Sequence, residues 1–442
     1  MQFKRSVAIA FLLSGIILIG AQLPFFNNKS SDIKTLNQNI SLSDPSNQAI
    51  SIGNQLIVKT ASEELNELPS KSCVAIQGSG RDFIQNLNGS EYFIPASAMK
   101  ILTAAVVLST LKPDSTLDTS LYGQVKSKNL TNGYIKTSGD PSFVRSLEPA
   151  SRRKPFLSPD KTRTFDAFAK GIKNAGVNKI DNLVVDNTWF GLDQIEAGWA
   201  DDKGIVGSLA ALSVDEGFSN NQLAESADQN GAQALLDSLV ANGITVGSIS
   251  FGVIPTTINN SSNLVAKTQS ASVKELVSEM LKTSNNVYAE QLLAASVHVE
   301  SGKVTEQSRE DFFNSKLSKL VASLEGFKFV NASGYTREAK VSCELLIEVL
   351  NVMSEKEIEI SDMSSIAGKD GTLTERFTFA SNEVSAKTGT LDGVTALSGD
   401  IANKLDFSFI SNSSFTQTQG YSYQDLVVKV LEKLVDKQEL KL

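Results

Sequence analysis

FIPASAMKILTAA, residues 93–105, places Ser97 and Lys100 three positions apart, just after Pro95 and at the start of an apolar run. Apolar residues recur there at helical spacing, which predicts a helix from near Ser97 to just before Pro113. Because positions i and i+3 share one helix face, the hydroxyl and the amine can form a hydrogen bond. Ser97 is then either a helix cap or a nucleophile that the lysine activates, and this segment alone leaves both interpretations open.

The spacing of Ser97 and Lys100 is not rare in this chain. It also occurs at Ser31/Lys34, Ser109/Lys112, Ser151/Lys154 and Ser158/Lys161. Only Ser97 both follows a proline and begins an apolar helix pattern, whereas Ser109 lies near the end of that pattern and the other serines lie in polar segments. Among these serines, Ser97 is therefore the favoured nucleophile.

A serine nucleophile in this chain cannot rely on an ordinary triad. His298 is the single histidine, and any Ser-His-Asp arrangement would have to use it. It follows Ser284 in one helical pattern at about 21 Å along the axis, which indicates a helix-end residue rather than a base. The activating group must be a lysine, which burial and a neighbouring cation can keep neutral.

Two further motifs follow later in the chain. Lys387-Thr388-Gly389 ends a strand pattern, where a glycine permits close approach of a ligand. Ser284-Asn285-Asn286 opens a helix pattern with Ser284 as its expected cap, and rival segments surround Ser219 and Ser262. The order Ser-x-x-Lys, Ser-x-Asn, Lys-Thr-Gly is the signature of the penicillin-binding proteins and serine β-lactamases.

A longer series of segments resembles one family, the class C low-molecular-mass penicillin-binding proteins, which are D-Ala-D-Ala carboxypeptidases and endopeptidases. The segments are IPASAMKILTAA (94–105), SGDPSF (138–143), DNTWF (186–190), AGWADD (197–202), LAALSVDEG (209–217), TSNNVYAEQLL (283–293), ASGYTREAKVS (332–342), AGKDGTLTERF (367–377) and AKTGTLDGVTALSGDI (386–401). The resemblance runs from about residue 50 to the end and favours Ser284 over its rivals. It implies an α/β (α+β) fold like that of the serine β-lactamases and DD-peptidases, with an antiparallel sheet flanked by helices and an inserted α/β domain.

Roles for individual residues follow from the resemblance. Ser97 would be acylated, and Lys100 would take its proton. Ser284 and Lys387 would return a proton to the departing D-alanine nitrogen, and Lys387 beside Lys100 would help to keep Lys100 neutral. The predicted substrate-binding residues are Asn286 for the substrate amide, Lys387 and Thr388 for the terminal carboxylate, Gly389 in the same motif, and Thr390, whose backbone N–H would complete the oxyanion site with that of Ser97.

The pattern along the chain predicts two parts. Alternating segments between Cys73 and Phe93, the helix patterns at 271–298, 305–325 and 341–356, and the strand patterns at 384–389, 394–401 and 405–412 suggest one antiparallel sheet with helices, built from residues 50–113 and 264–442. Residues 114–263 differ, because 164–186 and 232–252 each read as an amphipathic helix, a glycine stop and an apolar strand. We expect this stretch to form the inserted domain.

The amino terminus reads as an export segment. Lys4 and Arg5 precede an uncharged apolar run that extends to Phe26, so residues 1–26 are either a cleaved signal peptide or a membrane anchor. Residues 27–50 are polar and lack an apolar period, which is typical of a tether. We therefore expect an exported protein of the periplasm or cell envelope that touches a membrane only through this end.

Composition excludes several other classes. The net charge of −8 and the absence of a basic run argue against a nucleic-acid partner. Cys73 and Cys343 are the only cysteines, and their apolar settings favour two buried thiols, although a single bridge is possible. No Cys/His cluster suggests zinc, and the expected chemistry requires neither a metal nor an organic cofactor.

The favoured function is a serine D-Ala-D-Ala carboxypeptidase that acts on peptidoglycan stem peptides and is inhibited covalently by β-lactams. The alternative is a DD-endopeptidase, which cleaves peptidoglycan cross-links by the same acyl-enzyme chemistry. A non-catalytic wall-binding protein and a β-lactamase are less favoured, the first because the motif residues are intact and the second because no group is assigned to activate the deacylating water.

A few segments add detail without a chemical role. NASGYTR (331–337) replaces the Asp-Gly-Ser-Gly-Leu-Ser-Arg that is frequent in the family, which affects only local detail near the site. Gly139, Asp140 and the Gly198-Trp199 pair match the family and are interpreted as buried turns and packing.

Overall fold

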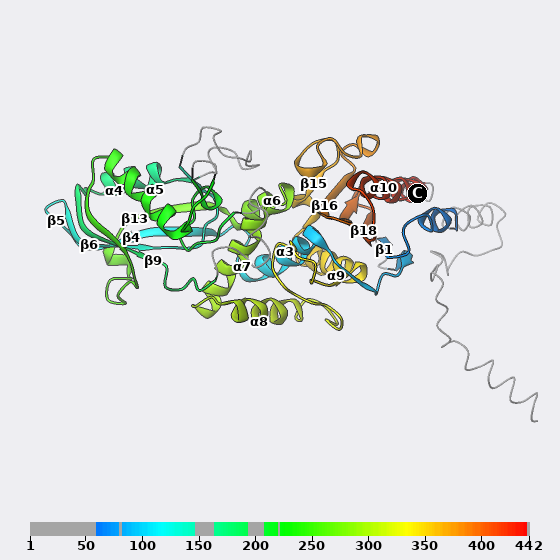
Figure 1. Ribbon diagram of the computed structural model, residues 1–442, viewed down its shortest axis with the longest axis horizontal. Helices are drawn as coiled ribbons and strands as arrows, with labels where there is room; N and C mark the ends of the chain where they lie inside the picture. The colour runs from blue at the N-terminus through cyan, green and yellow to red at the C-terminus, as the bar shows by residue number, and fades with distance from the viewer. Residues whose placement is uncertain (1–58, 79–81, 146–162, 193–206, 220–221, 440–442) are drawn as a thin grey trace, which may run out of the picture.

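The computed structural model describes residues 59–78, 82–145, 163–192, 207–219 and 222–439 (Figure 1). The predicted export segment 1–26, the tether 27–50 and Gly198-Trp199 lie outside the described residues. Within those ranges, no helix combines the length and the apolar character needed to cross a membrane.

One sheet is wholly antiparallel and carries the third motif. Its order is β15 (Ser365–Ile366), β16 (Val384–Leu391), β17 (Val394–Ile401), β18 (Leu405–Asn412), β1 (Ser72–Gly78) and β2 (Phe83–Leu87). The hairpin and the three strands expected from the alternating patterns are all present in it. Since side chains alternate along a strand, β1, β17 and β18 each contribute to two cores, one on each face of the sheet.

Helices cover both faces of this sheet. On one face lie α3 (Met99–Thr110), α6 (Val273–Lys282), α7 (Asn286–Ser301), α8 (Glu306–Leu317) and α9 (Cys343–Ser354), whose buried residues share a core with Ala75, Ala396 and Ile410. On the other face, α10 (Gln417–Glu439) and the helical residues 59–65 pack on Val74, Leu397 and Phe409. The predicted flanked antiparallel sheet is thus confirmed.

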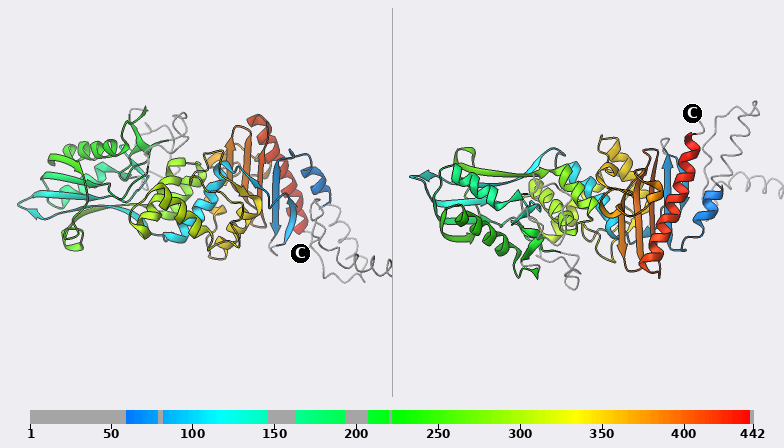
Figure 2. Two further views of the ribbon diagram at one scale, coloured as in Figure 1. Left: turned by 60° about the horizontal axis from the view of Figure 1, so that its bottom comes forward. Right: turned by 90° about the horizontal axis from the view of Figure 1, so that it is seen from above.

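A second sheet forms the opposite end of an elongated molecule (Figures 1 and 2). Its order is β12 (Thr245–Phe251), β9 (Lys179–Asp186), β6 (Asn129–Lys136), β4 (Thr116–Tyr122) and β13 (Leu264–Ser272), and β5 (Val125–Lys126) pairs with β6. Strand β9 runs parallel to β6 and β12, as helix-strand crossovers require. The two crossover helices, α4 (Phe165–Asn174) and α5 (Ala227–Ala241), share this sheet's core.

The second sheet extends beyond residue 263, the expected end of the inserted domain. Residues 264–272 were assigned to the antiparallel half, but as β13 they pair with β4 and close the second sheet. Segments of the insertion also enter the first core, where Trp189, Leu192 and Leu209 pack with α3 and α7. The helix pattern at 271–298 is likewise interrupted, because Ser284 between α6 and α7 has a φ of 57°.

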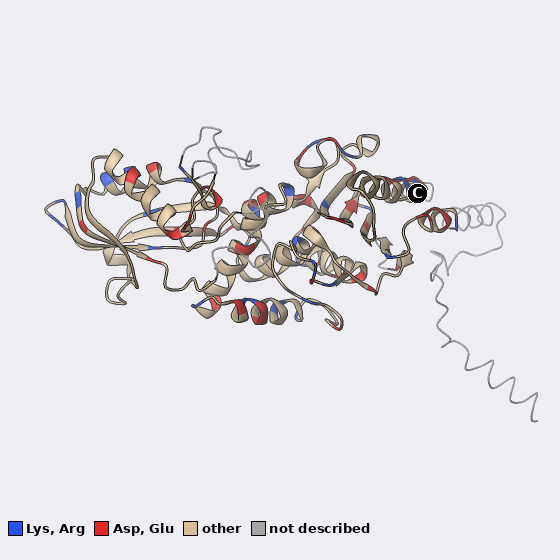
Figure 3. Ribbon diagram, viewed as in Figure 1, with Lys and Arg blue, Asp and Glu red and all other residues tan. Residues whose placement is uncertain are grey.

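The short pairings complete the connections between elements. They are β3 (Tyr92–Phe93) with β14 (Val341–Ser342), β7 (Phe143–Val144) with β8 (Arg163–Thr164), and β10 (Phe218–Ser219) with β11 (Gln222–Leu223). The first of these pairs Val341 and Ser342 with Phe93 and Tyr92, just before the segment that leads into Ser97. Basic and acidic residues are both distributed along the described chain, and α8 carries residues of both signs (Figure 3).

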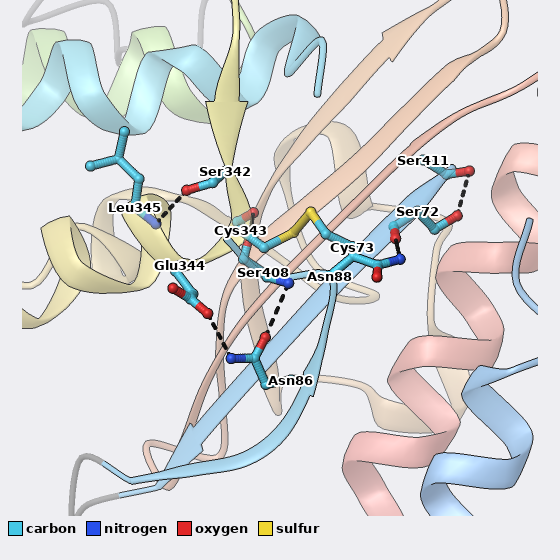
Figure 4. Close-up of a disulfide and its surroundings, with 12 residues drawn as sticks. Ser72, Cys73, Asn86, Asn88, Ser342, Cys343, Glu344, Leu345, Ser408 and Ser411 are labelled. Carbon is cyan, nitrogen blue, oxygen red and sulfur yellow. Dashed lines mark hydrogen bonds between the residues drawn. A yellow bond between two sulfur atoms is a disulfide. The ribbon is translucent and has the colours of Figure 1, made fainter. Parts of the chain in front are cut away.

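A disulfide joins Cys73 to Cys343, with their Cα atoms 6.0 Å apart (Figure 4). The prediction of two free thiols is therefore wrong. Each cysteine does lie where its pattern indicated, one on β1 and the other at the start of α9, and both are fully buried. Sequence could not show that the strand and the helix face each other, because 270 positions separate the two residues.

Candidate active site

Ser97 lies in the 3-10 turn Ala96–Ala98, which runs directly into α3. The residues that cap this turn and α3 are Pro95 and Ala98, and neither end has a side-chain cap hydrogen bond. The interpretation of Ser97 as a helix cap is therefore wrong. Its side chain is partly exposed and is available to a ligand.

Lys100, one turn further along, is fully buried, and hydrogen bonds hold its amine. Its Nζ is 3.0 Å from Ser97 Oγ, 2.7 Å from Asn286 Oδ1 and 2.7 Å from the carbonyl oxygen of Ser333. The last two partners can only accept, and they match the two N–H groups of a neutral amine. The lone pair of such an amine would face the hydroxyl of Ser97, as removal of its proton requires.

Ser284 and Lys387 form a second pair across the site. Lys387 Nζ donates to Ser284 Oγ at 2.9 Å and to the carbonyl oxygen of Thr388 at 2.6 Å. Burial of the whole side chain lowers the pKa of Lys387 to about 7. Near neutral pH this lysine can therefore either give or take a proton.

The helix cap expected at Ser284 belongs to its neighbour. Asn285 is the N-cap of α7, and its side-chain oxygen accepts from the backbone N–H of Tyr288 at 3.1 Å. Ser284 instead has the left-handed backbone conformation that turns the chain between α6 and α7, which is uncommon for a residue other than glycine. This turn directs its hydroxyl toward Lys387.

The Lys-Thr-Gly strand packs directly against the turn that carries Ser97. A Cβ atom on Gly389 would lie 2.6 Å from the carbonyl oxygen of Pro95 and 3.1 Å from the backbone nitrogen of Ala98. The glycine thus permits close approach of the protein's own backbone, rather than the ligand approach expected for it.

The remaining predicted residues lie along the same strand. Thr388 Oγ1 donates to Thr372 Oγ1 at 3.0 Å, and Thr390 is exposed. A cavity of about 720 Å³ begins at Thr390 and extends past Tyr335 and Arg337 toward α10. Among the predicted site residues, Thr390 is the one that lines this cavity.

The structure brings six of the eight residues selected from the sequence into two hydrogen-bonded groups, Ser97 with Lys100 and Asn286, and Ser284 with Lys387 and Thr388. Gly389 and Thr390 continue β16 beside the turn that carries Ser97. His298 lies away from them near the end of α7, where its ring stacks on Trp189 at a centroid distance of 4.2 Å. Sequence reasoning missed Ser333, which acts through its backbone, and Thr372, although both segments were noticed. Among the described residues, no group of three or more His, Cys, Asp or Glu side chains could hold a metal ion.

Comparison with known proteins places the chain in a family. The model of the family described as "D-Ala-D-Ala carboxypeptidase 3 (S13)" matches residues 58–234 and 205–434. The chain belongs to this family. The resemblance seen in the motifs is confirmed, and the protein is a serine peptidase of the D-Ala-D-Ala carboxypeptidase 3 family.

Several similar proteins have low sequence identity to this chain but match most of its length. A carboxypeptidase DacB of Mycolicibacterium smegmatis is 26% identical over 340 residues, which cover 72% of this chain and 71% of the relative. A D-alanyl-D-alanine carboxypeptidase of Actinomadura is 24% identical over 414 residues and covers 74% of each chain. Penicillin-binding protein 4 of Haemophilus influenzae has the same fold, with a TM-score of 0.67, 20% identity and coverage of 84% of this chain and 99% of its own.

Proposed function

We propose that this S13-family peptidase removes the terminal D-alanine of peptidoglycan stem peptides through an acyl-enzyme on Ser97. The observation that carries the proposal is the 3.0 Å contact between Lys100 Nζ and Ser97 Oγ, together with the contacts of the same amine with two carbonyl oxygens. Lys100 takes the hydroxyl proton while Ser97 Oγ bonds to the penultimate D-Ala carbonyl carbon. The backbone N–H groups of Ser97 and Thr390 donate hydrogen bonds to the carbonyl oxygen and stabilise the negative charge that develops on it.

Collapse of this intermediate breaks the peptide bond to the terminal D-alanine. Ser284 donates its proton to the departing nitrogen and regains one from Lys387, whose pKa of about 7 suits proton transfer in both directions. Water then hydrolyses the ester, which releases the shortened stem peptide and restores Ser97. Asn286 uses its carboxamide oxygen for Lys100, so its contact with the substrate would come from the amide nitrogen.

The terminal carboxylate would bind between Lys387 and Thr388. The hydroxyl of Thr372 lies within hydrogen-bond distance of Thr388 and adds a second hydroxyl at this place. The acyl part of the stem peptide would extend past Thr390 into the adjoining cavity. β-Lactams carry a carboxylate and an amide in a similar arrangement and would acylate the same serine.

A synthetic stem peptide that ends in D-Ala-D-Ala tests this function. The wild-type protein should release free D-alanine, and Ser97→Ala, which keeps the fold because Ser97 caps neither helix, should release none. A folded wild-type protein without D-alanine release on any stem peptide would contradict the proposal. Equal release by Ser97→Ala would contradict the assigned nucleophile.

Endopeptidase cleavage of cross-links is the second candidate. A predatory peptidoglycan endopeptidase of Bdellovibrio bacteriovorus has the same fold, with a TM-score of 0.56, 18% identity and coverage of 81% of this chain and 90% of its own. Separation of the products from purified cross-linked peptidoglycan distinguishes the two activities, because only an endopeptidase converts dimers to monomers. We place the enzyme outside the cytoplasm, where this substrate lies, on the basis of residues 1–26.

A further inference from the structure

A buried ion pair lies behind the turn that presents Ser333 to Lys100. Arg309 Nη1 on α8 donates to Glu290 Oε2 on α7 at 2.8 Å, and the two side chains are 1% and 0% exposed. Removal of two charges from water is costly, and an apolar pair would join two helices without that cost. The position of Glu290 is better explained by the other groups that it binds.

Both carboxylate oxygens of Glu290 also accept backbone hydrogen bonds from one short turn. The N–H of Ser333 donates to Oε1 at 2.8 Å, and the N–H of Ala332 donates to Oε2 at 3.0 Å. From the other side, Thr103 Oγ1 on α3 donates to the carbonyl oxygen of Ala332 at 2.7 Å. The turn is therefore held between α3 and α7, and the direction of its next carbonyl group is fixed.

That next carbonyl group is the one that binds Lys100. A neutral lysine amine has two hydrogens and one lone pair on a rotatable carbon–nitrogen bond. When Asn286 Oδ1 and the Ser333 carbonyl oxygen each hold a hydrogen, the lone pair of a neutral amine is left to face Ser97 Oγ at 3.0 Å. A shift of the Ser333 carbonyl group would let the Lys100 amine rotate about its carbon–nitrogen bond, so that its lone pair turns away from Ser97. All of the reacting groups would still be present.

We propose that Glu290 is a positioning residue for Lys100. Its carboxylate holds the amides of Ala332 and Ser333, which fixes the Ser333 carbonyl group and thereby aims the lysine lone pair at Ser97. Arg309 pairs the buried charge and holds the carboxylate in place. This inference rests on the proposed role of Lys100 as the base, and Glu290 itself touches neither substrate nor reacting atoms.

Glu290→Gln tests the inference with little change of shape. A carboxamide has one acceptor oxygen and one N–H₂ donor, so one of the two backbone amides loses its acceptor. The limiting rate of acylation by benzylpenicillin should fall about 10- to 100-fold, while the dissociation constant of the preceding non-covalent complex stays the same. An unchanged limiting rate in a folded variant would overturn the proposal.

Two other variants separate positioning from stability. Glu64→Gln weakens the 2.7 Å ion pair with Lys433 of α10, on the sheet face away from Ser97. This variant should lower the melting temperature slightly without slowing acylation. Thr103→Val releases the Ala332 carbonyl group and should slow acylation less than Glu290→Gln does. It also provides the test if Glu290→Gln does not fold, and an unchanged acylation rate would overturn the proposal.

A double-mutant cycle shows whether Glu290 acts through Lys100. In a Lys100→Ala background, Glu290→Gln should cause no further loss of the residual acylation rate, because the group that it positions is absent. A further loss of the same size as in the wild type would overturn the inference. If Lys100→Ala alone acylates at the wild-type rate, the proposed function fails instead, so the two failures are distinguishable.

Discussion

Two buried lysines lie in the site, and their different partners predict different losses. Lys100 contacts Ser97 and two acceptors, whereas Lys387 contacts Ser284 and the strand. Lys100→Ala should nearly abolish acylation of every substrate. Lys387→Ala should slow both peptides through the loss of proton delivery to Ser284, and it should slow a peptide with a free terminal carboxylate further. Second-order acylation rates for peptides with free and amidated carboxyl ends measure the difference. Equal losses on both peptides in Lys387→Ala would contradict the role of Lys387 in binding the carboxylate.

Lys387 also predicts a pH dependence of substrate binding. Burial lowers the pKa of this lysine to about 7, so the free enzyme loses the positive charge as pH rises through that value. The Michaelis constant for a peptide with a free terminal carboxylate should therefore increase above pH 7. The Michaelis constant for the amidated peptide should not change over this range. An equal increase in the Michaelis constants of both peptides would show that Lys387 does not bind the carboxylate.

Asp400 predicts a pH dependence of stability. Burial, together with the negative charges of Asp406 and Asp362, raises the pKa of Asp400 to about 7. Asp400 loses its proton near pH 4 in the unfolded chain but keeps it up to about pH 7 in the folded protein. The contribution of Asp400 to the free energy of unfolding is therefore full below pH 4 and is lost as pH rises through 7. Asp400→Asn should match the wild type in urea unfolding at pH 4 and exceed it at pH 8. A wild-type protein that is as stable as the variant at pH 8 would contradict this assignment.

At the residue scale, sequence identified the groups whose chemistry is in their side chains. The motifs were sufficient to select Ser97, Lys100 and Lys387, although their catalytic roles remain predictions. Sequence could not identify Ser333, because a backbone carbonyl group has no side-chain signal. Glu290 was missed because it lies in a helix that otherwise reads as apolar.

At the scale of elements, the disulfide joins β1 to the start of α9 across a long stretch of chain. Both cysteines are fully buried, and 270 positions separate them. Closure of so long a loop restricts the unfolded chain, so Cys73→Ala/Cys343→Ala should lower the free energy of unfolding by about 2–5 kcal/mol. Urea unfolding of the variant and of the wild type, each with and without dithiothreitol, measures the effect. A variant with wild-type stability under oxidising conditions would contradict it.

The elements that sequence placed correctly have strong periods of their own. The strands β16, β17 and β18 and the helix-strand units α4–β9 and α5–β12 are of this kind. The assignment of β13 was wrong because its exposed, polar side chains alternate weakly and its partner β4 lies far away in sequence. The turn at Ser284 was missed because a positive φ in a residue other than glycine leaves little trace in sequence.

At the scale of the whole molecule, the insertion and the main sheet share a core. Trp189 of the insertion is 7% exposed, stacks on His298 of α7 and donates to Thr137 Oγ1 at 2.7 Å. Trp189→Ala should lower the free energy of unfolding by about 3–5 kcal/mol and should affect both ends of the molecule. Urea unfolding followed by circular dichroism and by labelling with fluorescent penicillin should show one common shift. A shift in circular dichroism alone would mean that residues 114–263 unfold as an independent domain.

Mass measurement after reaction with benzylpenicillin tests directly whether Ser97, activated by Lys100, carries the acyl group. A β-lactam amide is strained and leaves an ester that blocks the approach of water, so the adduct should persist. The intact wild-type protein should gain the mass of one benzylpenicillin, and peptide mapping should place it on the peptide that contains Ser97. Ser97→Ala should gain none, and Lys100→Ala should gain it far more slowly. An adduct on another peptide, or no adduct on a folded wild-type protein, would contradict the account.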